Sequence, residues 1–203
     1  MTATVTIVDH GAGNLRSLRA AFERTGAQAA VTDQADEVRS ARLIVLPGVG
    51  AAAPAMRALD ARGLRTALED ALAGGGRMLG VCLGMQLLFE ASAEGDTPCL
   101  GLLPGCVEEI DWARRVPHMG WNDVASGGDG PLAHALPAVC YFAHSYAVTE
   151  AAPGLVAGTT EIAGRPIVSA VSDGRVTGVQ FHPEKSGAAG RAILEAWVHD
   201  ATA

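Results

Sequence analysis

Residues 77–90, RMLGVCLGMQLLFE, contain an apolar run that changes into a helical pattern at a cysteine. The first half predicts a buried strand, and the apolar spacing of the second half predicts a helix. Glycines stand two positions before and two positions after Cys82, which gives the pattern G-x-C-x-G. A sharp turn from strand to helix needs glycine beside its apex residue, because side chains there would collide. The stretch therefore predicts a cysteine presented at the carboxyl end of a strand.

Around this stretch, strand-like and helix-like segments alternate through residues 1–90. We expect strands at 4–8, 27–32, 42–48 and 77–82, and helices at 14–25, 33–40, 54–73 and 83–90. Asn14 is expected to cap the first helix, and Pro54 to stand in the first turn of the third. Such alternation indicates parallel strands joined by right-handed crossovers in an open α/β sheet.

The second half of the chain predicts short strands separated by turn signals, at 107–110, 116–124, 139–148, 155–160, 165–172 and 175–181. Asp173-Gly174 predicts a hairpin between the last two. Residues 187–199 predict an amphipathic helix. We therefore expect a single domain over residues 1–203, with an open, mixed, mainly parallel sheet flanked by helices and with extra antiparallel strands in the second half.

Composition excludes several classes of function. The 203 residues are 49% apolar and 18% charged, with a formal net charge of −7. No basic face favours nucleic acid or an anionic membrane, so neither partner is expected. No apolar stretch is long enough to span a bilayer. The start, MTATVTIVDHG, lacks the features of a signal peptide, so we expect a cytoplasmic protein.

The cysteines do not suggest a metal site or disulfides. Their spacing forms no C-x-x-C pairs, and a cytoplasmic chain seldom holds disulfides. Three of the four are expected to pack as free thiols: Cys99, Cys106 and Cys140. Cys82 is set apart by its glycines, although a buried structural cysteine remains the alternative.

QFHPEKS, at residues 180–186, offers a base for that thiol. Residues i and i+2 of an extended segment point to the same side. Glu184 can therefore orient one imidazole nitrogen of His182 while the other faces a cysteine, as in a catalytic triad. Taken alone, this motif could also be a solvent-exposed loop in which the histidine has no catalytic role. The pair of motifs predicts a cysteine nucleophile served by a histidine.

Two glycine-rich turns follow other strands. LPGVG, at 46–50, allows close backbone approach, so it is expected to supply an oxyanion donor beside the N–H of Leu83. A simple strand-to-helix turn is the alternative. GAGNLR, at 11–16, lacks the last glycine of a dinucleotide fingerprint, so nucleotide binding is not predicted. The remaining histidines are expected to be structural or on the surface: His10, His118, His134, His144 and His199. His118 and His144 stand in strand-like segments, from which they could face the site.

GVCLGMQLL, LPGVG and QFHPEKS closely resemble the class I glutamine amidotransferases, over essentially the whole chain. The resemblance implies a flavodoxin-like fold and hydrolysis of glutamine to glutamate and ammonia without cofactor or metal. It implies that Cys82 attacks the carboxamide, that His182 shuttles the proton and that Glu184 orients His182. The oxyanion hole would be formed by the backbone at Val49, Gly50 and Leu83. Glutamine would be held by Gly50, Gln86 and the backbone at His144, Ser145 and Tyr146.

Further stretches narrow the resemblance to the glutaminase subunits of imidazole glycerol phosphate synthases, which serve histidine biosynthesis. These are VPHMGWN at 116–122, YFAHSY at 141–146, Lys185-Ser186, and DHGAGN at 9–14. The resemblance implies a heterodimer with a separate (β/α)8 cyclase barrel that receives the ammonia through a channel. Trp121, Tyr141 and Lys185 match interface positions. The sequence departs from the family at two places, with His10 replacing the usual tyrosine and Ala52 replacing a frequent phenylalanine.

Three other readings remain open. The chain could be another class I amidotransferase subunit, such as one for anthranilate or pyridoxal phosphate, against which PHMGWN speaks. It could be a stand-alone hydrolase of γ-glutamyl substrates, fully active without a partner. It could be a regulatory module whose site has decayed, against which the intact Cys82, His182 and Glu184 speak. A switch is also expected, since a carbonyl of the P-G-V-G segment turned into the site would leave the oxyanion hole incomplete.

Overall fold

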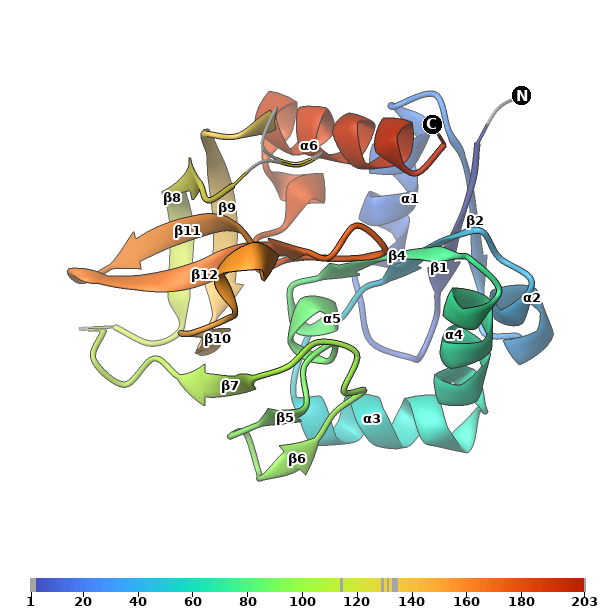
Figure 1. Ribbon diagram of the computed structural model, residues 1–203, viewed down its shortest axis with the longest axis horizontal. Coiled ribbons are helices and arrows are strands. Elements are labelled where there is room, and N and C mark those ends of the chain that lie inside the picture. The colour runs from blue at the N-terminus through green and yellow to red at the C-terminus, as the bar shows by residue number, and fades with distance from the viewer. Residues whose placement is uncertain (1–2, 114, 129, 131, 133–134, 203) are drawn as a thin grey trace.

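Five parallel strands form the centre of the computed structural model, which describes residues 3–113, 115–128, 130, 132 and 135–202 (Figure 1). The strands lie in the spatial order β2-β1-β3-β4-β13. Their bounds are β1 (Thr4–Val8), β2 (Gln28–Thr32), β3 (Leu43–Leu46), β4 (Arg77–Val81) and β13 (Val176–Val179). The order reverses between β1 and β3, as in flavodoxin-like folds, which bind ligands at the carboxyl ends of the strands.

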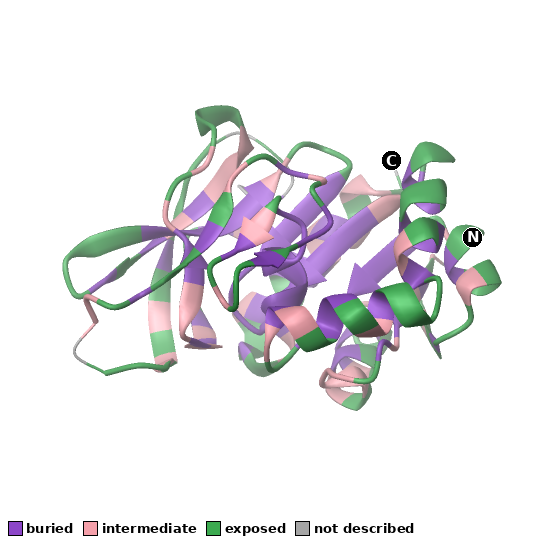
Figure 2. Ribbon diagram, turned by 90° about the horizontal axis from the view of Figure 1, so that it is seen from below, coloured by how far each residue is buried: buried purple, intermediate pink, exposed green. Residues whose placement is uncertain are grey.

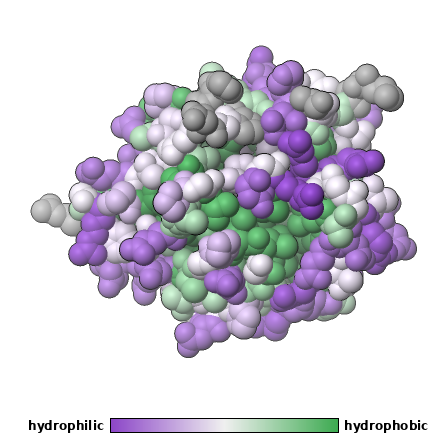
Figure 3. Space-filling model, in the orientation of Figure 1, coloured by the Kyte–Doolittle hydropathy of each residue, from purple (hydrophilic) through white to green (hydrophobic). Residues whose placement is uncertain are grey.

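Helices cover both faces of these strands (Figure 1). α1 (Leu15–Glu23) and α6 (Gly187–Asp200) pack on one face through Leu18, Phe22 and Trp197. α2 (Ala35–Arg39), α3 (Ala52–Ala61) and α4 (Leu64–Ala73) pack on the other. Every residue of β3 is buried, as a strand covered on two sides requires. Buried residues make up most of the strands at the centre of the molecule (Figure 2). On the face seen in Figure 1, apolar residues gather near the middle and hydrophilic residues surround them (Figure 3).

Antiparallel strands extend the sheet beyond β13. β12 (Arg165–Ser172) joins β13 through the Asp173-Gly174 turn, and β10 (Tyr146–Val148), β7 (Cys106–Glu109), β5 (Ala91–Ser92) and β6 (Thr97–Pro98) follow. β11 (Val156–Ile162) pairs with β12 and with β8 (His118–Ser126), which pairs with β9 (Ala138–His144). Short 3-10 turns η2 (Pro153–Leu155) and η3 (Pro183–Lys185) precede β11 and α6. The predicted mixed, mainly parallel α/β sheet with extra antiparallel strands is confirmed.

Several local predictions were wrong. The helix expected at 54–73 is two helices, because Gly63 adopts a left-handed conformation with φ of 65°. The strand expected at 139–148 is broken at Ser145, and its halves, β9 and β10, pair with different strands. The helix expected at 83–90 ends at Gln86. Asn14 stands at the start of α1 but makes no side-chain cap there.

No helix formed by the described residues is long and apolar enough to cross a membrane.

Candidate active site

Cys82 is the apex of the turn between β4 and α5 (Leu83–Gln86). Its φ is 55° and its ψ is −111°, a conformation that residues with a side chain rarely adopt. The Cys82 N–H donates to the carbonyl oxygen of Val179 at 2.8 Å, which fixes the apex against β13. Strain of this kind is maintained only where the surrounding structure enforces it, and it is typical of functional sites.

The glycines around Cys82 are required by close packing. A Cβ on Gly84 would lie 1.8 Å from the Leu46 carbonyl oxygen, and one on Gly80 would lie 2.6 Å from the Gly84 carbonyl oxygen. A Cβ on Gly48 would lie 2.8 Å from Leu83 Cβ. The turn at Cys82 therefore packs directly against the end of β3, which brings LPGVG beside the cysteine.

His182 and Glu184 lie just beyond β13. The His182 Nδ1 is 3.0 Å from Glu184 Oε1, and the two side chains are only 5% and 0% exposed. Burial by itself lowers the pKa of His182, but interactions with the Cys82 sulfur and with the Glu184 carboxylate outweigh it and raise that pKa to about 9. The imidazole is consequently protonated at neutral pH and can supply a proton.

A cavity of about 440 Å³ joins these groups. Its size lies within the range of about 300–1,000 Å³ that is typical of small-molecule sites. It contains Cys82 and His182 and every residue predicted for the oxyanion hole and for glutamine binding. The lining residues are Val49, Gly50, Cys82, Leu83, Gln86, Glu94, Pro117, Ala143, His144, Ser145, Tyr146, His182 and Lys185. Glu184 lies behind the cavity, where it contacts the imidazole.

The histidines differ in their relation to this cavity. His144 lines it, and burial lowers its pKa to about 4, so the ring is neutral and its Nδ1 donates to the Tyr146 carbonyl at 2.9 Å. His118 packs edge-on against His144 with ring centroids 5.5 Å apart. His10 donates from Nε2 to the Pro47 carbonyl at 2.8 Å and so supports the P-G-V-G segment from behind. His199 lies on α6, and His134 lies outside the described residues.

Four residues at the site were not predicted from the sequence. Asn14 Nδ2 lies 3.5 Å from Glu184 Oε1, and Gln180 Nε2 lies 3.8 Å from Cys82 Sγ. Glu94 accepts the N–H of Ala52 at 2.8 Å. Ser186 Oγ donates to the His182 carbonyl at 2.7 Å and accepts the N–H of Tyr141 at 3.0 Å. Gln180 and Ser186 belong to QFHPEKS, so the motif itself was the signal for those two.

The three residues that match interface positions cluster on the surface beside the cavity. Trp121, on β8, is 59% exposed and meets Tyr141, on β9, edge to face at 6.0 Å between ring centroids. Lys185 Nζ lies 5.6 Å from the centroid of the Tyr141 ring, and Lys185 also lines the cavity.

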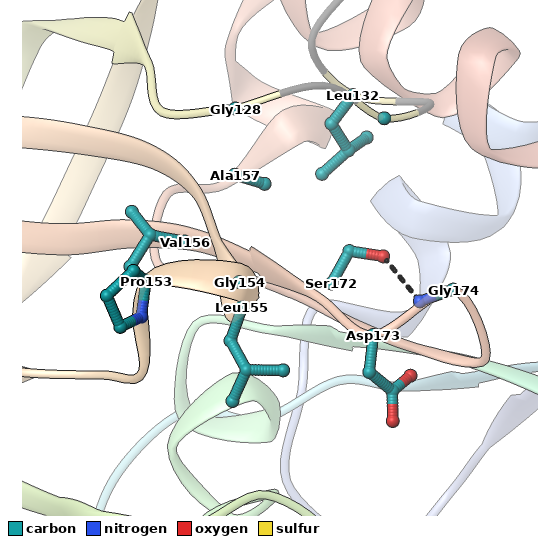
Figure 4. Close-up of a pocket in the computed structure, with 11 residues that line it drawn as sticks. Gly128, Leu132, Pro153, Gly154, Leu155, Val156, Ala157, Ser172, Asp173 and Gly174 are labelled. Carbon is teal, nitrogen blue, oxygen red and sulfur yellow. Dashed lines mark hydrogen bonds between the residues drawn. The ribbon is translucent and has the colours of Figure 1, made fainter.

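A second cavity, of about 490 Å³, lies between the β12–β13 turn, η2 and the residues Gly128, Gly130 and Leu132 (Figure 4). Its polar groups are bonded internally. The Gly174 N–H donates to Ser172 Oγ at 3.2 Å, and Asp173 Oδ1 accepts the N–H of Arg175 at 2.8 Å. The described residues that line it include no histidine and no cysteine. The described lining of this cavity therefore lacks the thiol and imidazole pair found at Cys82.

Known proteins resemble this chain in sequence over nearly its whole length. The family model described as "Glutamine amidotransferase class-I" matches residues 6–201. The "Imidazole glycerol phosphate synthase subunit HisH" of Thiobacillus denitrificans is 44% identical, covering 96% of this chain and 90% of that protein. The protein of the same name from Cutibacterium acnes is 43% identical, covering 96% of each chain.

Solved structures resemble the fold at lower identity. A crystal structure of a glutamine amidotransferase superposes with a TM-score of 0.78 at 19% identity, covering 98% of this chain and 99% of the other. The structure of PurLQS from Thermotoga maritima gives 0.74 at 20% identity, with coverage of 98% and 99%. By its sequence relatives and its family match, the chain belongs to the class I glutamine amidotransferases and, among them, to the HisH subunits of imidazole glycerol phosphate synthase.

Proposed function

We propose that this HisH chain hydrolyses glutamine with Cys82, His182 and Glu184 and passes the ammonia to a separate cyclase subunit. The observation that carries the proposal is the arrangement of one cavity. The strained Cys82 thiol and the His182 imidazole both line it, and a fully buried carboxylate holds the far nitrogen of that imidazole. This is the arrangement of nucleophile, base and orienting group that acyl transfer needs.

The first half-reaction forms a thioester. The Cys82 sulfur attacks the carboxamide carbon of glutamine and the carbonyl becomes a tetrahedral oxyanion. As the C–N bond breaks, the leaving nitrogen takes the proton held on His182, and ammonia departs. Because its pKa is raised to about 9, His182 carries that proton at neutral pH. Glu184 Oε1 accepts the hydrogen bond from His182 Nδ1 and stabilises the imidazolium.

Hydrolysis of the thioester reverses these roles. Water attacks the acyl carbon while the now neutral His182 accepts its proton. The C–S bond breaks, glutamate leaves, and the proton returns to the Cys82–His182 pair. One glutamine and one water thus give one glutamate and one ammonia, and the enzyme is regenerated.

The oxyanion is assigned to the backbone around LPGVG and the turn at Cys82. Leu83 is the first residue of α5, so its N–H has no partner within the helix. The second donor is assigned to the backbone at Val49 and Gly50. Gly50 has a φ of 89°, and because glycine adopts positive and negative φ about equally, the peptide there is able to turn. Loss of one such donor costs about 10² to 10³ in rate, so a turned peptide would keep the free subunit slow.

Glutamine binding is assigned to Gly50, Gln86 and the backbone at His144, Ser145 and Tyr146. Ser145 falls between β9 and β10, where the chain leaves one strand pair for another. Backbone groups at this break are not all committed to a ladder and are therefore able to bind the polar ends of an amino acid.

The cyclase partner is proposed to dock over the mouth of the cavity. Large apolar side chains are exposed in the P-G-V-G segment that lines the cavity, just before β8, on β8 and on β9: Val49 at 43%, Val116 at 40%, Met119 at 62%, Trp121 at 59% and Val139 at 49%. Exposed apolar residues gathered beside a site mark an interaction surface. The expected partner is the (β/α)8 barrel implied by the resemblance, which would use the ammonia in the cytoplasm to make imidazole glycerol phosphate and aminoimidazole carboxamide ribotide.

The test is glutamine hydrolysis by this chain alone, with a cognate cyclase barrel, and with the barrel and its ribotide ligand. Cys82→Ala is the blank. We expect a large increase only when barrel and ligand are both present. Full activity of the free chain, unchanged by the barrel, would instead identify a stand-alone hydrolase and make the proposed interface wrong.

A further inference from the structure

A buried glutamine that does not itself line the cavity contacts the sulfur of Cys82. Gln180 directly follows β13, is 0% exposed, and continues the pairing with β12 through its N–H, which donates to the Ser169 carbonyl at 2.9 Å. Its side-chain Nε2 lies 3.8 Å from Cys82 Sγ, within hydrogen-bonding distance of sulfur. The mechanism above gives this residue no task.

The orientation of the Gln180 amide is fixed by a chain of hydrogen bonds. Gln86 Nε2 donates to the Tyr146 carbonyl at 2.8 Å and to Gln180 Oε1 at 3.0 Å. A backbone carbonyl can only accept, so the NH2 group of Gln86 must face Tyr146. That NH2 group makes Oε1 of Gln180 the acceptor. The NH2 group of Gln180 is then turned toward Cys82.

The same hydrogen bonds determine that Gln86 presents its side-chain oxygen, Oε1, to the cavity. Both N–H groups of Gln86 are used by acceptors inside the protein, so its Oε1 is left to meet a donor. Glutamine carries such donors in its α-ammonium group and its carboxamide NH2. Gln180 therefore influences the site in two ways, at the nucleophile and at the substrate-binding amide.

We infer that Gln180 has two roles. It donates a hydrogen bond to the Cys82 sulfur when that sulfur is negatively charged, and it holds Gln86 in the orientation that binds glutamine. The inference rests on the proposed function, because it assigns the roles of Cys82 and Gln86. A donor to a charged acceptor stabilises that charge more than a donor to a neutral one. The residues preceding Gln180, Val176 to Val179, are all buried and apolar or small. An apolar side chain would suit the packing alone, since a buried amide is costly unless it is fully bonded.

The donor role is tested without a partner or glutamine, by alkylation of the free chain. Iodoacetamide is applied from pH 6 to pH 9, and mass spectrometry follows the peptide that contains Cys82, which separates it from the exposed Cys106. We expect Gln180→Leu and Gln180→Glu each to slow alkylation of Cys82 at pH 7 by about three- to tenfold, since a hydrogen bond to a charged group is worth about 1.5 kcal/mol and tenfold corresponds to 1.36 kcal/mol. Ser169→Ala is the matched control and should react like the wild type, because Ser169 Oγ has no partner among the described residues.

Steady-state kinetics of the complex with the cyclase and its ligand separate the two roles. Gln180→Glu keeps the acceptor for Gln86 and loses the donor to sulfur, so kcat should fall about tenfold while KM stays within about twofold. Gln180→Leu loses both, so KM for glutamine should rise as kcat falls. Circular dichroism checks that each variant is folded.

If Cys82 in the folded Gln180 variants is alkylated at the wild-type rate, the donor role is wrong. If the KM for glutamine is equal in Gln180→Leu and Gln180→Glu, the role of Gln180 in orienting Gln86 is wrong. A wild-type complex that does not hydrolyse glutamine would overturn the proposed function, while the alkylation result would still decide the contact with Cys82.

Discussion

Cys82 and Glu184 together raise the pKa of His182, so replacing Glu184 should change the pH dependence of the reaction. In Glu184→Gln the imidazolium loses its carboxylate partner, so the pKa of His182 should fall from about 9. His182 must be protonated to release ammonia, so the alkaline limb of kcat/KM should move to lower pH. An NMR titration of the His182 ring measures the pKa directly. Glu195→Gln is the control, because Glu195 forms only an exposed pair with Arg191.

The raised pKa of His182 also makes the free energy of unfolding depend on pH. The pKa of His182 is higher in the folded state than its ordinary value of 6.5. Its contribution to the free energy of unfolding is therefore fully present below about pH 6.5 and is lost as the pH rises through about 9. Urea denaturation at pH 6 and at pH 9.5 should show a smaller difference for Glu184→Gln than for the wild type. An equal difference in both proteins would contradict the assignment of this shift to Glu184.

Asn14 should behave as a site residue and not as a helix cap. A side chain that caps a helix contributes about 1 kcal/mol, but Asn14 makes no cap and instead directs Nδ2 toward Glu184 at 3.5 Å. Asn14→Ala should lower the free energy of unfolding by less than that amount while reducing glutaminase activity in the complex. Thermal unfolding and steady-state kinetics on one preparation measure both. A large loss of stability with unchanged kcat would show that the residue is only structural.

At the scale of elements, the contact between the end of β3 and the turn at Cys82 tolerates no side chain. Gly84→Ala would place a Cβ 1.8 Å from the Leu46 carbonyl oxygen, so the backbone must move. We expect a loss of about 3 kcal/mol or more in the free energy of unfolding, at the upper end of overpacking costs. Gly154→Ala is the control, because nothing lies within 4 Å of its added Cβ. Chemical denaturation compares the two, and equal stabilities would contradict the packing described here.

Elements whose signal is local were predictable from the sequence, and elements defined by distant partners were not. β3, β4 and the turn at Cys82 follow from apolar runs and flanking glycines. β5 and β6 have two residues each and exist through pairing with each other and with β7, which no local pattern shows. Gly63 stands inside a helical apolar pattern, so its left-handed conformation was hidden. The contacts of Asn14 with Glu184 and of Gln180 with Cys82 join residues far apart in sequence, and only the fold brings them together.

At the scale of the whole molecule, the exposed aromatic residue on β8 should matter for assembly and not for folding. Trp121 is 59% exposed, so Trp121→Ala should leave the melting temperature of the free chain almost unchanged. A buried aromatic anchor is worth about 2 kcal/mol or more at an interface, so the affinity for the cyclase should fall by about thirtyfold. Isothermal titration calorimetry measures the affinity of each variant for the cyclase. Val31→Ala, on β2 at the opposite edge of the parallel strands, should bind like the wild type.

The hydrogen bond from the His182 N–H to the Tyr141 carbonyl ties the reactive histidine to β9, which pairs with β8 and packs Tyr141 against the exposed Trp121. Ser186 Oγ closes a second link between the same two segments. Deuterium uptake at the amide of His182 therefore depends on how often β9 separates from η3. A subunit that covers Trp121 and Tyr141 should slow that uptake without entering the cavity. The exchange rate at the His182 amide, inside the site, would thus show whether the partner has bound at the surface.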